Sequence, residues 1–73
     1  MAKFGIQNNV RALRFEKGEL TQQELADMVE ATRQTIVSIE KNKYSPSLDL
    51  AFRIAKALEV EIGDAFTYKE IKK

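Results

Sequence analysis

Two helix starts that lie close together in the chain constrain its fold more than any other feature. Residues 21–24 are Thr-Gln-Gln-Glu, the pattern of a capping box, in which the Thr21 side chain can accept from the Glu24 N–H and the Glu24 carboxylate can accept from the Thr21 N–H. Thr32 is a second N-cap, and apolar residues at helical spacing follow each cap. Helices of about eight and ten residues joined by only about three or four cannot lie flat against each other, so we predict that they cross steeply.

Turn residues divide the rest of the chain into further short helical segments. The expected helices run from Asn9 to Lys17, from Thr21 to about Val29, from Thr32 to Lys41, from Leu48 to Leu58 and from Ile62 to Phe66. Residues 67–71 fit an extended segment and a frayed helix end equally well, and no other stretch indicates a strand. The sequence therefore predicts an all-α fold class: one compact five-helix domain over residues 1–73, with its core at about 9–66 and a C-terminal tail at 67–73.

Composition excludes several classes of protein. The 73 residues include no Cys and no His, so zinc sites of the Cys/His type, disulfides, thiol nucleophiles and imidazole bases are excluded. No apolar run is long enough to cross a membrane, and the N-terminus lacks the apolar stretch of a signal peptide, so we expect a cytoplasmic protein with no membrane partner. Carboxylate chemistry is not formally excluded, but Glu24/Asp27 and Asp49/Arg53 are more simply solvated helix charges. We therefore expect no enzyme activity, metal, cofactor or small-molecule ligand.

The charges are polarised along the chain, although the net charge is only +1. Residues 15–31 contain Lys17 against five acids (net −4), residues 32–56 contain five bases against Glu40 and Asp49 (net +3), and residues 1–14 contain three bases (net +3). A domain polarised in this way can present a basic face to phosphates. The signal is weak, because many folded domains are polarised by chance.

Two short helices that cross steeply are the geometry of a helix-turn-helix, whose second helix enters the major groove of DNA. The predicted inward face of the second helix is Ile36, Ile39 and Glu40. Its outer face then includes Arg33, Gln34 and Ser38, which suit guanine, adenine and either base respectively. An ordinary solvated helix face would show the same pattern, so this face alone does not establish DNA contact.

Longer motifs make most of the chain recognisable. They are L-T-Q-x-E-L-A from Leu20, R-Q-T-I-x-x-I-E from Arg33 and P-S-L-x-L-A-x-x-I-A-x-x-L from Pro46. At this spacing they resemble the lambda repressor and Cro family of helix-turn-helix regulators, also called the xenobiotic-response-element family, over roughly residues 9–66. The resemblance implies a DNA-binding domain whose motif is residues 22–41. It also implies a sequence-specific double-stranded DNA-binding transcriptional regulator, expected to be a repressor, that contacts the major groove with helix 32–41.

The resemblance also assigns roles to single positions. Base contacts are implied for Arg33, Gln34, Val37 and Ser38, where Val37 can meet a thymine methyl group. The expected contacts to the DNA backbone are Gln22, Thr32, Thr35, Lys41, Asn42 and Lys43. For Lys41, a simple interaction with the helix C-terminus is an equally good interpretation. Arg14 and Glu40 match a pair that forms a buried salt bridge between the first and third helices of relatives.

Two positions depart from the family pattern. Glu30 occupies the turn position that is usually Gly, and a left-handed backbone costs a non-Gly residue roughly 1–2 kcal/mol. We therefore expect an altered turn or a longer helix there. Glu19 is an extra residue between Gly18 and Leu20, which affects the expected register of the first helix and the pairing of Arg14.

One helix contacts too few base pairs to select a site in a genome, so we expect a homodimer on a palindromic operator with half-sites about 34 Å apart. The apolar residues left without partners in the tail, Phe66, Tyr68 and Ile71, are the expected dimer interface. The alternative function is a small helical protein-interaction module of the same fold, antitoxin-like or coactivator-like.

Overall fold

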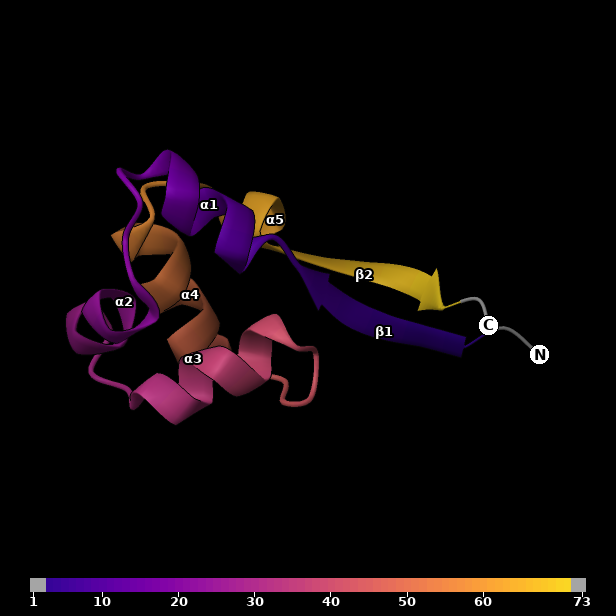
Figure 1. Ribbon diagram of the computed structural model, residues 1–73. Helices are drawn as coiled ribbons and strands as arrows, with labels where there is room; N and C mark the ends of the chain where they lie inside the picture. Colours follow the sequence, from indigo (N-terminus) through magenta and orange to yellow (C-terminus); the bar gives the residue numbers. More distant parts are fainter. Residues whose placement is uncertain (1–2, 72–73) are drawn as a thin grey trace.

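The computed structural model describes residues 3–71, which form five helices flanked by two strands (Figure 1). In chain order the elements are β1 (Lys3–Asn8), α1 (Val10–Glu16), α2 (Gln22–Met28), α3 (Arg33–Glu40), α4 (Leu48–Ala57), α5 (Ile62–Ala65) and β2 (Phe66–Ile71). The helices lie where helices were expected. The predicted all-α fold class is wrong, because the two ends of the described chain pair as a sheet.

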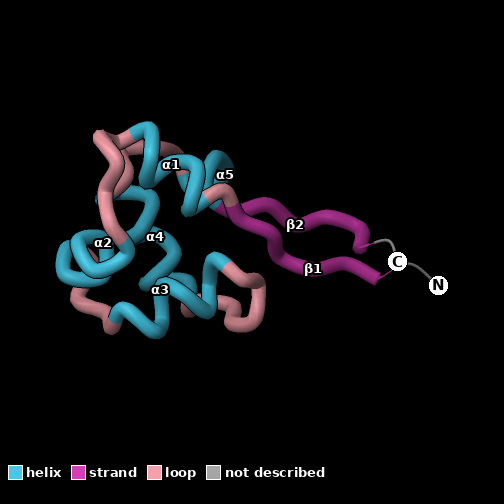
Figure 2. Tube along the Cα trace, viewed as in Figure 1, coloured by secondary structure: helices cyan, strands magenta, loops and turns pink. Residues whose placement is uncertain are grey.

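β1 and β2 form a two-stranded antiparallel ribbon that projects from the helical body (Figure 2). Asn8 pairs with Phe66 at the base of the ribbon, and Lys3 pairs with Ile71 at its far end. Apolar and polar residues alternate over only part of each strand, at Phe4 and Ile6 in β1 and at Phe66 and Tyr68 in β2, so the strand pattern is weak. The helices bring both segments to the same place, where the backbone N–H and C=O groups of one pair with those of the other. The C-terminal segment, for which two forms were equally expected, is therefore extended.

Side-chain caps start α2, α3 and α4 at the expected residues. Thr21 Oγ1 accepts from the Glu24 N–H at 3.0 Å, and Glu24 Oε1 accepts from the Thr21 N–H at 2.8 Å. Thr32 and Ser47 likewise cap α3 and α4 with their hydroxyl oxygens. These oxygens satisfy N–H groups that have no partner inside the helix, which confirms the predicted helix starts.

A residue with a left-handed backbone follows each of the helices α1, α2, α3 and α4. After α2, α3 and α4 this residue is not a glycine. The φ angles are 87° at Gly18, 58° at Glu19, 60° at Glu30, 59° at Asn42 and 60° at Glu59. After α2, the Ala31 N–H donates back to Ala26 O at 2.9 Å, which is the bond of a Schellman helix end. The predicted change at Glu30 is wrong: α2 ends at Met28, and Glu30 itself adopts the left-handed conformation.

The core lies where α1, α2, α3 and α4 meet, with α4 in the middle of the helical body (Figure 1). Its buried residues are Val10, Leu25, Ala26, Val29, Ile36, Ile39, Leu50, Ile54 and Leu58. Phe66 packs partly against this core and so joins the base of the ribbon to the helices. Within residues 3–71, no helix is both long and apolar enough to cross a bilayer.

Candidate nucleic-acid interface

α3 lies at the edge of the helical body, with one side on the core and the other exposed (Figure 1). Ile36 and Ile39 are completely buried. Of the four residues expected to contact bases, Arg33 and Gln34 are exposed, and Val37 and Ser38 are half-buried. Gln34 Nε2 donates to Ser38 Oγ at 3.3 Å, so these two polar groups lie on the same side, one turn apart. α3 therefore presents a guanidinium, a carboxamide and a hydroxyl group from a surface that the core holds in place.

A shallow hollow of about 370 Å³ lies beside the outer side of α3. Its walls are Thr32, Gln34, Thr35, Ser38, Lys43 and Tyr44. Three of the expected backbone contacts, Lys41, Asn42 and Lys43, are exposed at the end of α3 and in the turn after it. Tyr44 was not expected here, because an isolated aromatic residue in the sequence is more often part of a core or interface. The structure thus places a phenol beside a lysine and the polar groups of α3.

A second depression, of about 450 Å³, opens between α1, α2 and α3. Arg11, Gln22, Val37 and Lys41 are among the residues that line it. The Arg11 guanidinium lies 5.8 Å from the centroid of the Phe15 ring, a cation–π distance. Sequence reasoning did not single out Arg11, for which the basic charge of residues 1–14 was the available signal.

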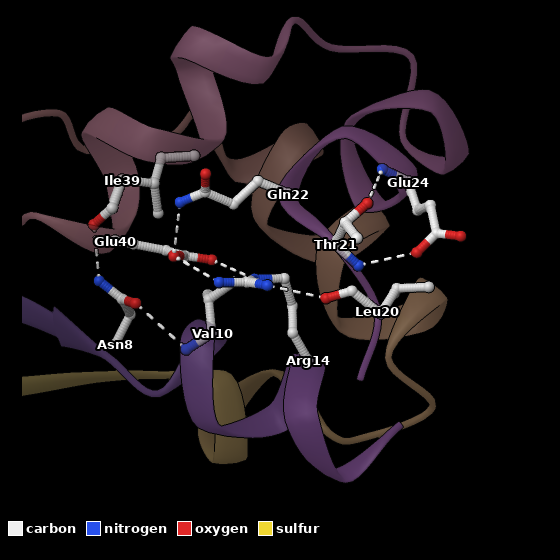
Figure 3. Close-up of polar contacts among 9 residues, drawn as sticks. All are labelled: Asn8, Val10, Arg14, Leu20, Thr21, Gln22, Glu24, Ile39 and Glu40. Carbon is white, nitrogen blue, oxygen red and sulfur yellow. Dashed lines mark hydrogen bonds and ion pairs between the residues drawn. The ribbon is translucent and has the colours of Figure 1, made fainter. Parts of the chain in front are cut away.

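A buried ion pair fixes α3 against α1 (Figure 3). Arg14 Nε donates to Glu40 Oε2 at 2.6 Å, and Arg14 Nη2 donates to Glu40 Oε1 at 3.0 Å. The third nitrogen, Nη1, donates to Leu20 O at 2.7 Å, and Gln22 Nε2 donates to Glu40 Oε1 at 3.1 Å. The extra residue, Glu19, is taken up in the turn after α1 and leaves this pairing intact. Gln22, an expected backbone contact, thus also holds Glu40.

Asn8 is a functional candidate that sequence reasoning missed (Figure 3). Its Nδ2 donates to Ile39 O at 2.8 Å and to Asn42 Oδ1 at 2.9 Å, and its Oδ1 accepts from the Val10 N–H at 3.1 Å. A single Asn before a predicted helix indicates no more than a local cap. Its partners at the end of α3 could not be found without the fold.

Arg53 on α4 supports the turn between α2 and α3. Its Nη1 donates to Val29 O at 2.5 Å, next to the left-handed Glu30, whose carboxylate lies 3.9 Å from the same nitrogen. Arg53 Nη2 also pairs with Asp49 Oδ2 at 3.0 Å. A guanidinium from α4 therefore satisfies a carbonyl at the end of α2, where the turn carries no glycine.

The acidic residues that could suggest catalysis or metal binding have local partners. Glu24 is part of the capping box, Asp27 accepts from Gln23 Nε2 at 2.9 Å, and Asp49 pairs with Arg53. In the part of the chain that the structure describes, no group of three or more acidic residues is arranged to hold a metal ion.

The residues expected at a dimer interface have different environments. Tyr68 is 70% exposed, and its ring stacks on that of Phe4 with the ring centroids 5.5 Å apart. Phe66 is half-buried against the helical core, so less of its surface is free. The side chain of Ile71 lies outside the described residues. Among the side chains that the structure describes, the exposed large apolar residues of the ribbon are Phe4, Ile6 and Tyr68, from both strands.

Comparison with known proteins identifies the family. A helix-turn-helix family model matches residues 10–64, which run from the first residue of α1 into α5. The chain therefore belongs to the helix-turn-helix family of the Cro and lambda repressor type, as the motifs indicated.

Relatives and a solved structure agree with this assignment. An uncharacterized helix-turn-helix-type transcriptional regulator from Methanothermobacter thermautotrophicus is 56% identical over 62 residues, which cover 84% of this chain and 88% of the relative. Another from Methanocaldococcus jannaschii is 55% identical over 51 residues, covering 70% and 77%. The crystal structure of a candidate DNA-binding protein from Bacteroides fragilis is similar with a TM-score of 0.77 and 27% identity. That similarity covers 86% of this chain and all of the other.

Proposed function

We propose that this chain is a sequence-specific, double-stranded DNA-binding transcriptional regulator that contacts bases in the major groove with α3. The family to which the chain belongs is one of DNA-binding transcriptional regulators. One observation supports base contact by α3: this helix buries Ile36 and Ile39 and leaves Arg33 and Gln34 exposed at the edge of the body. An α-helix presented in this way fits the width of the major groove.

The proposal divides the surface into two kinds of contact. Base contacts are assigned to Arg33, Gln34, Val37 and Ser38. Contacts to the DNA backbone are assigned to Gln22, Thr32, Thr35, Lys41, Asn42 and Lys43, and the two depressions beside α3 add Arg11 and Tyr44. Backbone contacts set the register of the protein on the duplex, whereas base contacts determine which sequence it prefers.

We further propose that two copies bind a palindromic operator, with the ribbon between them. Phe4 is 53% exposed and Tyr68 is 70% exposed. Covering Phe4, Ile6 and Tyr68 in both copies would remove roughly 600 Å² from water, about half of what a small specific interface buries. We therefore propose a weak dimer that adjacent half-sites stabilise. We also propose that the protein represses transcription rather than activating it, and that it acts in the cytoplasm.

Enrichment of bound duplexes from a random DNA pool tests the function. A single preferred motif, present as two inverted copies, is the expected result. Arg33→Ala and Gln34→Ala should lower affinity for the enriched duplex toward that for a scrambled duplex, with little change in the thermal midpoint. The exposed Lys56 in the last turn of α4 provides a control, since Lys56→Ala removes one positive charge from outside the proposed DNA contacts. If Arg33→Ala lowers the affinity for the enriched duplex and for the scrambled duplex by the same factor, as Lys56→Ala is expected to do, Arg33 does not contact bases.

Salt dependence separates backbone contacts from base contacts. Lys43→Ala should weaken binding to every duplex alike and reduce the slope of log K against log[salt] by about one. An unchanged slope would remove Lys43 from the set of phosphate contacts.

The alternative, a protein-interaction module, is favoured by a different surface. Leu48 and Phe52 lie one turn apart on α4 and are both exposed, on a helix that the proposed DNA contacts do not use. If no duplex is enriched at low salt, this alternative replaces DNA recognition as the function.

A further inference from the structure

The side chain of Asn8 connects three elements through all of its strong hydrogen-bonding groups. Both Nδ2 hydrogens are donated, one to Ile39 O at 2.8 Å and one to Asn42 Oδ1 at 2.9 Å. Its Oδ1 accepts from the Val10 N–H at 3.1 Å, at the first residue of α1. Its backbone pairs with Phe66 in the ribbon. One amide group therefore links the base of the ribbon, the start of α1 and the end of α3.

The contacts on α3 fall at the point where the helix ends. Ile39 is in the last turn, and its carbonyl also accepts from the Asn42 N–H at 2.9 Å. Asn42 is left-handed, with φ 59°, and the next N–H, that of Lys43, returns to Ser38 O at 2.9 Å. Asn8 thus contacts both the last helical turn and the residue that directs the chain away from it.

This position matters for DNA recognition, and the inference here rests on the proposed function of α3. Ile36 and Ile39 hold one side of α3 on the core, but Lys41, Asn42 and Lys43 are exposed. A hydrogen bond to a base edge requires its donor within a few tenths of an ångström of the correct place, whereas attraction to phosphates tolerates larger shifts.

We propose that Asn8 is a positioning residue for base recognition. It fixes the C-terminal end of α3 and the Asn42–Lys43 turn relative to α1 and the ribbon. Loss of its donors lets this end of α3 shift, which weakens the base contact of Ser38 and, through the hydrogen bond from Gln34 Nε2 to Ser38 Oγ, that of Gln34. The general attraction of the domain for DNA changes less.

The test compares Asn8→Ala with Gln7→Ala, a change at the neighbouring exposed residue of β1. Affinities for the enriched and the scrambled duplex are measured by fluorescence anisotropy, well below the thermal midpoint of each variant. Asn8→Ala is expected to lower affinity for the enriched duplex about tenfold, equivalent to about 1.4 kcal/mol, and to leave the scrambled duplex unchanged. Gln7→Ala should change neither. In an Asn42→Ala background the effect of Asn8→Ala should be smaller, because one of its partners is already absent.

A second pair of variants covers the case in which Asn8→Ala does not fold. Asn8→Asp keeps an oxygen for the Val10 N–H but removes both donors, and Gln7→Glu makes the same change of charge next to it. A larger loss of sequence preference for Asn8→Asp than for Gln7→Glu supports the proposal.

Three results would overturn the inference. A purely structural role would lower the thermal midpoint of Asn8→Ala but leave the ratio of the two affinities at its wild-type value. Equal behaviour of Asn8→Asp and Gln7→Glu would show that the donors do not position α3. Absence of any sequence preference in the wild-type protein would overturn the proposed function and this inference together, whereas the first two results leave the proposed function standing.

Discussion

Glu40→Gln removes the negative charge of the buried ion pair with almost no change in shape. The Arg14 and Glu40 side chains are only 8% and 7% exposed, so neither charge is well solvated. In the native protein the carboxylate accepts two hydrogen bonds from Arg14 and one from Gln22. A carboxamide offers one oxygen and places an NH₂ group against the other guanidinium donor. The positive charge of Arg14 would then remain buried without a counter-charge.

The expected cost is large for a domain of this size. Removing one partner of a buried pair costs about 3–5 kcal/mol, mainly because the remaining charge is stranded. Small domains lose about 4–8 °C in thermal midpoint per kcal/mol, so we expect a fall of at least ~12 °C. Leu20 O keeps its bond from Arg14 Nη1, which prevents a larger loss.

Urea unfolding followed by circular dichroism measures this change, with Glu16→Gln as the matched control. Glu16 is an exposed acid on α1, so its replacement makes the same change of charge without stranding a buried group. The double variant Arg14→Met with Glu40→Leu should recover part of the loss, because an apolar pair needs no counter-charge. The recovery is partial, since in the double variant Leu20 O loses its donor, Arg14, and Gln22 loses its acceptor, Glu40. A cost below about 1 kcal/mol for Glu40→Gln would refute the reasoning, because that is the range of solvated surface pairs.

Three further substitutions test the turn and the caps by urea unfolding. Glu30→Gly should stabilise the protein by about 0.5–1 kcal/mol, because relief of the left-handed strain exceeds the extra free-energy cost of ordering a glycine backbone on folding. Destabilisation would mean that the Glu30 side chain contributes more to stability than the strain costs. Thr21→Ala should cost about 1 kcal/mol through loss of the α2 cap, and Thr21→Ser should cost little; equal effects would exclude the cap as the cause. Arg53→Ala should cost about 1–3 kcal/mol because Val29 O loses its donor, and Asp49→Ala, which removes only a surface pair, should cost less.

The errors in the sequence-based prediction concern the two ends of the described chain and the turn between α2 and α3. The all-α fold class is wrong because the segment Lys3–Asn8 has a weak strand pattern and pairs with residues at the other end of the chain. The expected change at Glu30 is wrong because the prediction weighed only the local backbone strain. In the folded protein, Arg53 from α4 bonds to the carbonyl of Val29 directly before that residue. The assigned DNA contacts and the homodimer stay predictions, which the experiments above test.

The amino-acid sequence alone predicts the helix starts, the polar outer side of α3 and most of the buried side of each helix, although Met28 and Leu48, which helical spacing places on the apolar sides of α2 and α4, are exposed. These depend on residues three or four positions apart, such as Thr21 with Glu24, whose proximity follows from helix geometry alone. The ribbon of Lys3–Asn8 with Phe66–Ile71, and the bonds from Asn8 to the end of α3, become visible only in the folded protein. Those partners are distant in the chain, and only the packing of the helices on one core brings them within hydrogen-bonding distance.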